Sequence, residues 1–205
     1  MRLSWLILLP LLAACNSTPS AVNEGTATPA VRDSAALPAP DTAHTKAVTA
    51  LADTLRTARA QHNFSNPDGP PDTFQLVFRG TSLLEGTGEF TIADARGQVI
   101  FREVLTAPDL EASLVYEMKK PTATRAEREA FVRQRIDQFF RPAQFHAPAV
   151  GPRATFPARV ENLDHATWAD LQRRPGTVGF DYLKGKEDRQ RLAWSPLKKQ
   201  TVRVQ

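Results

Sequence analysis

The chain has 205 residues, of which 41% are hydrophobic and 23% charged, and its formal net charge is +4. Its single cysteine excludes a disulfide framework and the zinc sites that need several thiolates. The composition is typical of a globular fold that rests on a hydrophobic core, and the length beyond residue 42 suits one domain.

The first fifteen residues have the form of a secretion signal. Arg2 supplies positive charge, and the apolar run from Trp5 to Leu12 is far shorter than the roughly 20 residues of a membrane-spanning helix. The run leads into Leu12-Ala13-Ala14-Cys15, which resembles the lipobox of bacterial lipoproteins. The resemblance implies that residues 1–14 are removed and that Cys15 receives more than one acyl chain, as stable anchoring requires. The alternative is an ordinary signal peptide that contains a cysteine.

Residues 15–42 are expected to form the lipidated cysteine and a tether. The stretch from Asn16 to Thr42 is rich in Ala, Pro, Thr and Ser and has no aromatic residue, so it cannot bury enough apolar surface to offset its ordering entropy. A random coil of this length has a reach on the order of 30 Å. For a lipoprotein, Asn16 in place of an aspartate implies an anchor in the outer membrane.

A single domain is expected over residues 43–205, with a core that starts near residue 73. Apolar residues at three- and four-residue spacing predict a helix over 43–62, or a weakly helical end of the tether. Alternation of apolar and polar residues predicts several strands, of which Leu110–Met118 has the clearest pattern. The other strands predicted in this half are 74–79, 88–93 and 98–106.

Two helices are predicted from capping residues. Thr124 and Glu127 form a capping box for a helix that ends before Pro142 and leaves Phe131 off its apolar face, and Asp164 caps a shorter one. The apolar face of the first helix is expected to comprise Ala126, Ala130, Val132, Ile136, Phe139 and Phe140. Strands over 177–183, 189–195 and 201–204 close the chain. Together these elements predict the α+β class, with a mainly antiparallel sheet covered on one face by helices.

Three segments, Phe74–Gly80, Arg135–Phe140 and Gly179–Leu183, resemble uncharacterised lipoproteins of Bacteroidota. The resemblance covers most of the domain and implies no activity. The acidic cluster that such bacteria place after the cysteine for surface display is missing from Asn16–Pro19. Its absence implies an anchor that faces the periplasm.

Catalytic and metal-binding patterns are sparse. The histidines His44, His62, His146 and His165 do not have metal-ligand spacing, so neither a metal nor another cofactor is expected. Asp164 beside His165 is better explained as a helix cap than as the orienter of a general base. Two weak candidates remain: His146, in a Pro-rich loop that could line a cleft, and the carboxylates of Glu85 and Glu89. They support an alternative function as a hydrolase-like periplasmic enzyme.

Charge is unevenly distributed along the chain. From Ala21 to Met118 there are 7 Lys and Arg against 13 Asp and Glu, whereas from Lys119 to Gln205 there are 18 against 9. Basic residues flank the last predicted hairpin, among them Lys184, Lys186, Arg189 and Arg191. They either protect a sheet edge and pair with acidic residues across strands, or they bind an anionic partner.

The leading hypothesis is therefore a membrane-anchored envelope lipoprotein whose domain is a non-enzymatic binding module. Its expected partners are the membrane, through the lipid anchor, and another envelope protein or an anionic envelope polymer. Nucleic acid is not expected in this compartment.

Overall fold

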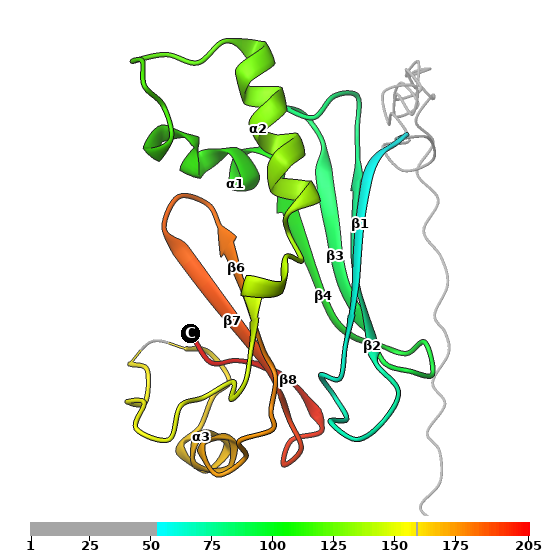
Figure 1. Ribbon diagram of the computed structural model, residues 1–205, viewed down its shortest axis with the longest axis vertical. Coiled ribbons are helices and arrows are strands. Elements are labelled where there is room, and N and C mark those ends of the chain that lie inside the picture. Colours follow the sequence, from blue (N-terminus) through cyan, green and yellow to red (C-terminus); the bar gives the residue numbers. More distant parts are fainter. Residues whose placement is uncertain (1–52, 159) are drawn as a thin grey trace, which may run out of the picture. The chain divides into compact units, whose positions relative to one another are not determined.

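The computed structural model describes residues 53–158 and 160–205, which belong to one compact unit. These residues form two antiparallel four-stranded sheets and three α-helices (Figure 1). The predicted α+β class and antiparallel pairing are confirmed. The strands are divided between two sheets because a long helical crossing, residues 107–144, separates the first four from the last four. The predicted signal, Cys15 and the tether lie outside the described residues.

Sheet A is a meander in which each strand pairs with the next along the chain. Its strands are β1 (Thr54–His62), β2 (Asp72–Arg79), β3 (Thr87–Ala93) and β4 (Val99–Thr106). The strands predicted from alternation in this region are confirmed. The helix predicted over 43–62 is wrong over its described part, because β1 pairs with β2 along its whole length. Ala58 and Ala60 face the core in alternation, a signal that small side chains make weak.

The strand predicted over Leu110–Met118 is also wrong. The helix α1 (Ala107–Glu111) and the 3-10 helix η2 (Ala112–Tyr116) occupy this segment. A capping box between Thr106 and Asp109 starts α1 directly after β4, and a proline in its first turn supports that start. The capping box and the proline therefore determine the structure of this segment, although apolar and polar residues alternate over Leu110–Met118.

The helix α2 (Arg125–Asp137) begins with the predicted capping box of Thr124 and Glu127. Phe131, expected to lie off the apolar face, is buried, whereas Ala126 and Ala130 are exposed. The helix ends at Asp137, and the short 3-10 helix η3 (Pro142–Gln144) follows. The buried residues Phe139 and Phe140 thus belong to the connection after the helix.

Sheet B has the strand order β5-β6-β7-β8. Its strands are β5 (Phe145–His146), β6 (Gly179–Lys184), β7 (Asp188–Ser195) and β8 (Gln200–Arg203). Asp164 caps the helix α3 (His165–Gln172), as predicted. Its side chain accepts a hydrogen bond from the Thr167 N–H at 2.7 Å. The predicted closing hairpin and last strand are confirmed.

The main core joins the two sheets through aromatic side chains. Phe74 and Phe90 of sheet A and Phe180 and Tyr182 of sheet B are all buried in it, together with Phe139 and Phe140. A second, smaller cluster lies on the other face of sheet B, where Trp168 and Leu171 of α3 pack against Ala193 and Val202. Within the described residues, no helix is long and apolar enough to cross a membrane.

Candidate functional site

An exposed apolar surface lies where η2 meets the turn between β6 and β7. Val115 is 52% exposed and Tyr116 is 59% exposed, so two large side chains that follow each other in the sequence are both largely open to solvent. We call the surface formed by Leu114, Val115, Tyr116, Met118, Lys119, Lys120 and Lys186 the η2–hairpin surface.

The β6–β7 turn is fixed against this segment by polar contacts. The Gly185 N–H donates to the Asp109 carbonyl oxygen at 3.0 Å, and the Tyr116 hydroxyl donates to the Glu187 carboxylate. The Lys186 ammonium lies 5.2 Å from the centre of the Tyr116 ring, within the range of a cation–π contact. Segments about 70 residues apart in the sequence therefore form one surface.

Two hollows open on the η2–hairpin surface. One has a volume of about 280 Å³ and is lined by Leu114, Met118, Lys119 and Lys120, among others. The second, of about 570 Å³, shares Leu114 and Met118 and also reaches Val115. Leu114, Val115 and Met118 thus line hollows on this surface, and Val115 and Tyr116 are exposed on it. Such apolar surfaces are expected where a protein contacts a partner or a lipid phase.

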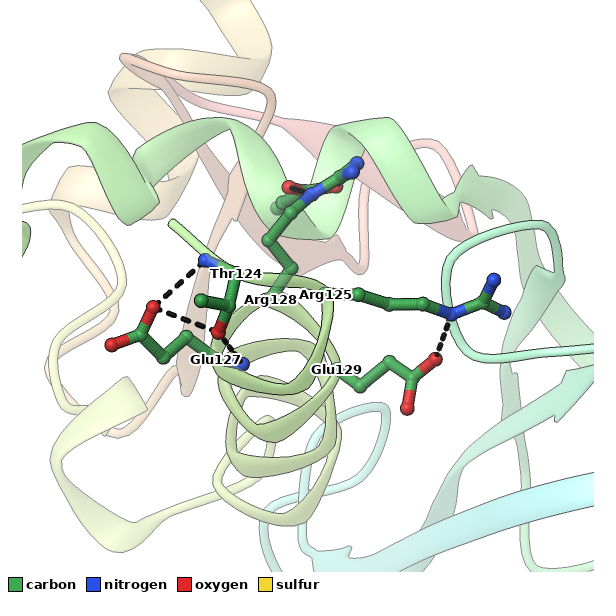
Figure 2. A network of polar contacts seen from close by, with 6 residues as sticks. Thr124, Arg125, Glu127, Arg128 and Glu129 are labelled. Atoms are coloured by element: carbon green, nitrogen blue, oxygen red, sulfur yellow. Dashed lines mark hydrogen bonds and ion pairs between the residues drawn. The ribbon is translucent and has the colours of Figure 1, made fainter. Parts of the chain in front are cut away.

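Polar contacts at the start of α2 fix the chain between α1 and α2, which includes η2 (Figure 2). The Thr124 N–H donates to the Glu127 carboxylate at 2.8 Å and the Glu127 N–H donates to Thr124 Oγ1 at 3.3 Å, which together form the capping box. Arg128 makes two hydrogen bonds to Glu111 of α1, one of them 2.8 Å long. Because this bidentate pair joins α1 to α2, the residues between them form a closed loop with a defined shape.

The four basic residues predicted as an anion-binding group lie on different surfaces of the domain. Lys184 turns towards sheet A, whereas Arg191 donates to Asp181 at 2.7 and 2.9 Å on the opposite face of the hairpin. Arg189 is exposed, and only Lys186 belongs to the η2–hairpin surface. The four therefore do not share one surface, and anion binding by them stays a prediction.

Glu103 of β4 is the centre of a polar cluster that joins the two sheets. Its side chain is 10% exposed and accepts hydrogen bonds from the Lys184 ammonium, at 2.8 Å, and from the Tyr182 hydroxyl. A guanidinium nitrogen of Arg203 on β8 lies 3.2 Å from the same carboxylate. A polar hollow of about 440 Å³ opens beside the cluster. One largely buried carboxylate is thus shared by two cations and a phenol.

The pKa values in this cluster follow from these contacts. Burial acts to raise the pKa of Glu103, but the hydrogen bonds from Lys184 and Tyr182 and the charge of Arg203 lower it below its usual value. Burial, and then the bond to Glu103, raise the pKa of Tyr182. At neutral pH Glu103 is therefore a carboxylate and Tyr182 a neutral donor. This arrangement serves as a structural link between β4, β6 and β8.

His146, the weak cleft candidate, lies on β5 next to a carboxylate. Its Nε2 atom is 3.9 Å from Asp181 Oδ1, too far for a hydrogen bond, and Asp181 is already paired with Arg191. Burial lowers the pKa of His146 below its usual value, Arg191 lowers it further, and Asp181 partly opposes them. The ring packs against Gly179, where an added Cβ would approach Nε2 to 2.8 Å. His146 therefore packs against the backbone, and no carboxylate of the described residues lies within hydrogen-bond distance to orient it as a general base.

The other candidates lie in ordinary surface contacts. Glu89, on the outer face of sheet A, is 3.0 Å from Arg102, and Glu85 accepts a hydrogen bond from Thr81 at 2.9 Å in the loop before β3. Neither contact brings the two carboxylates together. His165 stacks on Phe156, with 3.9 Å between the ring centres, and His62 stacks on Phe145 at 3.5 Å. His44 is outside the described residues.

Within residues 53–158 and 160–205, no group of three or more potential metal ligands is found. The sequence does not predict the η2–hairpin surface, because the alternation over Leu110–Met118 favours a strand with one buried face. Thr106 and Asp109 at capping-box spacing, with Pro108 between them, were the local signal that could have revealed it. The Glu103 cluster has no local signal, because Glu103 is about 80 residues from Tyr182 and Lys184 in the sequence.

Comparison with family models, curated proteins and solved structures finds no match to this chain.

Proposed function

We propose that this protein is a lipid-anchored envelope lipoprotein whose domain is a non-catalytic interaction module. In this proposal Cys15 carries the lipid, the anchor lies in the outer membrane, and the domain faces the periplasm. The η2–hairpin surface is the binding surface. The single observation that carries the proposal is the adjacent exposure of Val115 and Tyr116, in a segment that is held in shape by contacts to α1, α2 and the β6–β7 turn.

The hydrolase alternative has less support. A general base needs a substrate proton within hydrogen-bond reach and a partner that orients it. The carboxylate nearest to His146 is Asp181, which is engaged by Arg191. Glu89 is engaged by an arginine in the same way. The geometry around these residues therefore favours structural pairing.

Site-specific photocrosslinking in intact envelopes tests the interaction surface. A photoreactive residue in place of Val115 is expected to give a defined adduct, because this side chain would be covered in the bound state. Val99, which is 44% exposed near the start of β4, is the matched control and is expected to give none. Equal yields at both positions, or no adduct at Val115, would contradict the proposal. The adduct should disappear when Tyr116→Ser is added.

A further inference from the structure

We infer that the η2–hairpin surface docks on the lipid bilayer itself, with Val115 and Tyr116 in the headgroup region. The inference rests on the proposed lipid anchor and names the partner of the proposed surface. Its occupant is the membrane that holds the anchor, not a protein. Three features carry the inference: where the chain enters the domain, the kinds of side chain on the surface, and the balance of their charges.

The described chain begins at the end of the domain that carries this surface. The Asp53 carbonyl oxygen accepts a hydrogen bond from the Gly80 N–H at 3.3 Å, and the Gly86 carbonyl oxygen accepts one from Ala107, the first residue of α1. The loop between β2 and β3 therefore connects the start of β1 to the start of α1. Both lie in the upper part of Figure 1. A tether of the predicted reach, on the order of 30 Å, would hold this end at a high effective concentration of lipid.

The side chains suit a membrane interface. Val115, Leu114 and Met118 are apolar, and Tyr116 has an exposed ring with a polar end that contacts Glu187. Tyrosine is enriched at the level of lipid headgroups because its ring is apolar and its hydroxyl is polar. Lysines surround these residues, and their long stems can lie along an apolar phase while the ammonium groups stay in water. The Lys186 ammonium lies over the Tyr116 ring, 5.2 Å from its centre, so one of these lysines is already next to an aromatic side chain of the surface.

The charges on and around this surface are balanced. Lys120 lies 3.4 Å from Glu127, Lys186 is next to Glu187, and Lys119 is close in sequence to Glu117. A surface with matched charges is not drawn strongly to an anionic partner. Burial of apolar groups is then the main driving force, so docking should depend only weakly on salt and on anionic lipid.

Fluorescence quenching in vesicles tests the inference. Tyr116→Trp keeps an amphipathic aromatic side chain and adds a reporter. The complete lipidated protein is placed in vesicles of zwitterionic phospholipid with brominated acyl chains. Fluorescence above that of the parent protein, which keeps Trp168 and Trp194 after removal of residues 1–14, is then measured. Both variants have the same anchor, so a difference in quenching between them reports which part of the domain touches the lipid. We expect strong quenching of the tryptophan at position 116. We expect little quenching of a Val99→Trp control, because Val99 is at the start of β4 and α1 follows the end of that strand.

Second-site variants and lipid composition complete the test. Val115→Ser is expected to reduce the quenching at position 116 at least twofold, whereas Val99→Ser leaves it unchanged. Equal quenching at positions 116 and 99 would overturn the inference, as would quenching that appears only when phosphatidylglycerol is added and vanishes with salt. A photocrosslink from position 115 to a protein, without quenching at position 116, would overturn the bilayer inference but leave the proposed interaction module intact. A lack of both signals would overturn both.

Discussion

Replacing Phe90 by alanine is expected to lower the free energy of unfolding by about 3–5 kcal/mol. Phe90 is fully buried in β3, and six aromatic rings surround it, with centroid distances between 5.2 and 6.4 Å. The neighbours come from both sheets and from the connection after α2, so alanine would leave a cavity that no single element can fill. Domains of this size are stable by only about 5–15 kcal/mol.

Urea unfolding followed by tryptophan fluorescence measures this loss. Val104→Ala is the control, because Val104 is 57% exposed on the neighbouring strand β4 and its truncation should change stability by less than about 0.5 kcal/mol. If Phe90→Ala cost less than about 1 kcal/mol, the two sheets would not share the core described here.

Replacing Glu103 by glutamine is expected to cost about 2 kcal/mol at pH 7. Glutamine keeps the shape and one acceptor oxygen but leaves Lys184 and Arg203 without their shared anion. Removing one partner of a fully buried ion pair costs about 3–5 kcal/mol. The side chains of Lys184 and Arg203 are 34% and 40% exposed, so water compensates part of that loss.

The matched control is Glu89→Gln on β3. Glu89 also pairs with an arginine, 3.0 Å away, but its side chain is 38% exposed. Exposed pairs contribute about 0–1 kcal/mol, so this variant should be near the parent protein in chemical denaturation. Equal losses for the two variants would show that Glu103 is not the buried centre of the cluster.

The effect of Glu103→Gln should also depend on pH. The pKa of Glu103 in the folded protein is lower than its ordinary value of 4.5, so ionisation favours the folded state. This contribution is fully present above the unfolded pKa and is lost as pH falls through the folded pKa. The difference in stability between the parent protein and Glu103→Gln should therefore be constant near neutral pH and shrink below pH 4.5. A difference that grew in acid would contradict the assignment.

Local signals predicted much of the fold. The alternation around Phe74, the capping box of Thr124 and the cap at Asp164 each involve residues within a few positions of each other, and the predicted strand and both helices are present there, although α2 ends earlier than expected. These signals depend on backbone periodicity and on short side-chain to backbone bonds, which do not need tertiary information.

Features that depend on distant partners could not be predicted. The strand β1 is defined by pairing with β2, and its small inward-facing residues carry little hydrophobic signal. Glu103 meets Tyr182 and Lys184 only because the helical crossing brings sheet B against sheet A. The sequence likewise could not show which basic residues of the hairpin were already paired. For the candidate site, it supplied Lys186 but not the apolar residues of η2.

The lipid on Cys15 is the claim on which the tether, the location and the bilayer contact all depend. Metabolic labelling of cells with a clickable fatty acid, followed by capture of this protein, tests it directly. We expect strong label on the parent protein and none on Cys15→Ser, which should remain as an uncleaved precursor because processing follows lipid transfer to the thiol. Label that persists undiminished on Cys15→Ser, or a parent protein without label, would show that Cys15 does not carry the lipid.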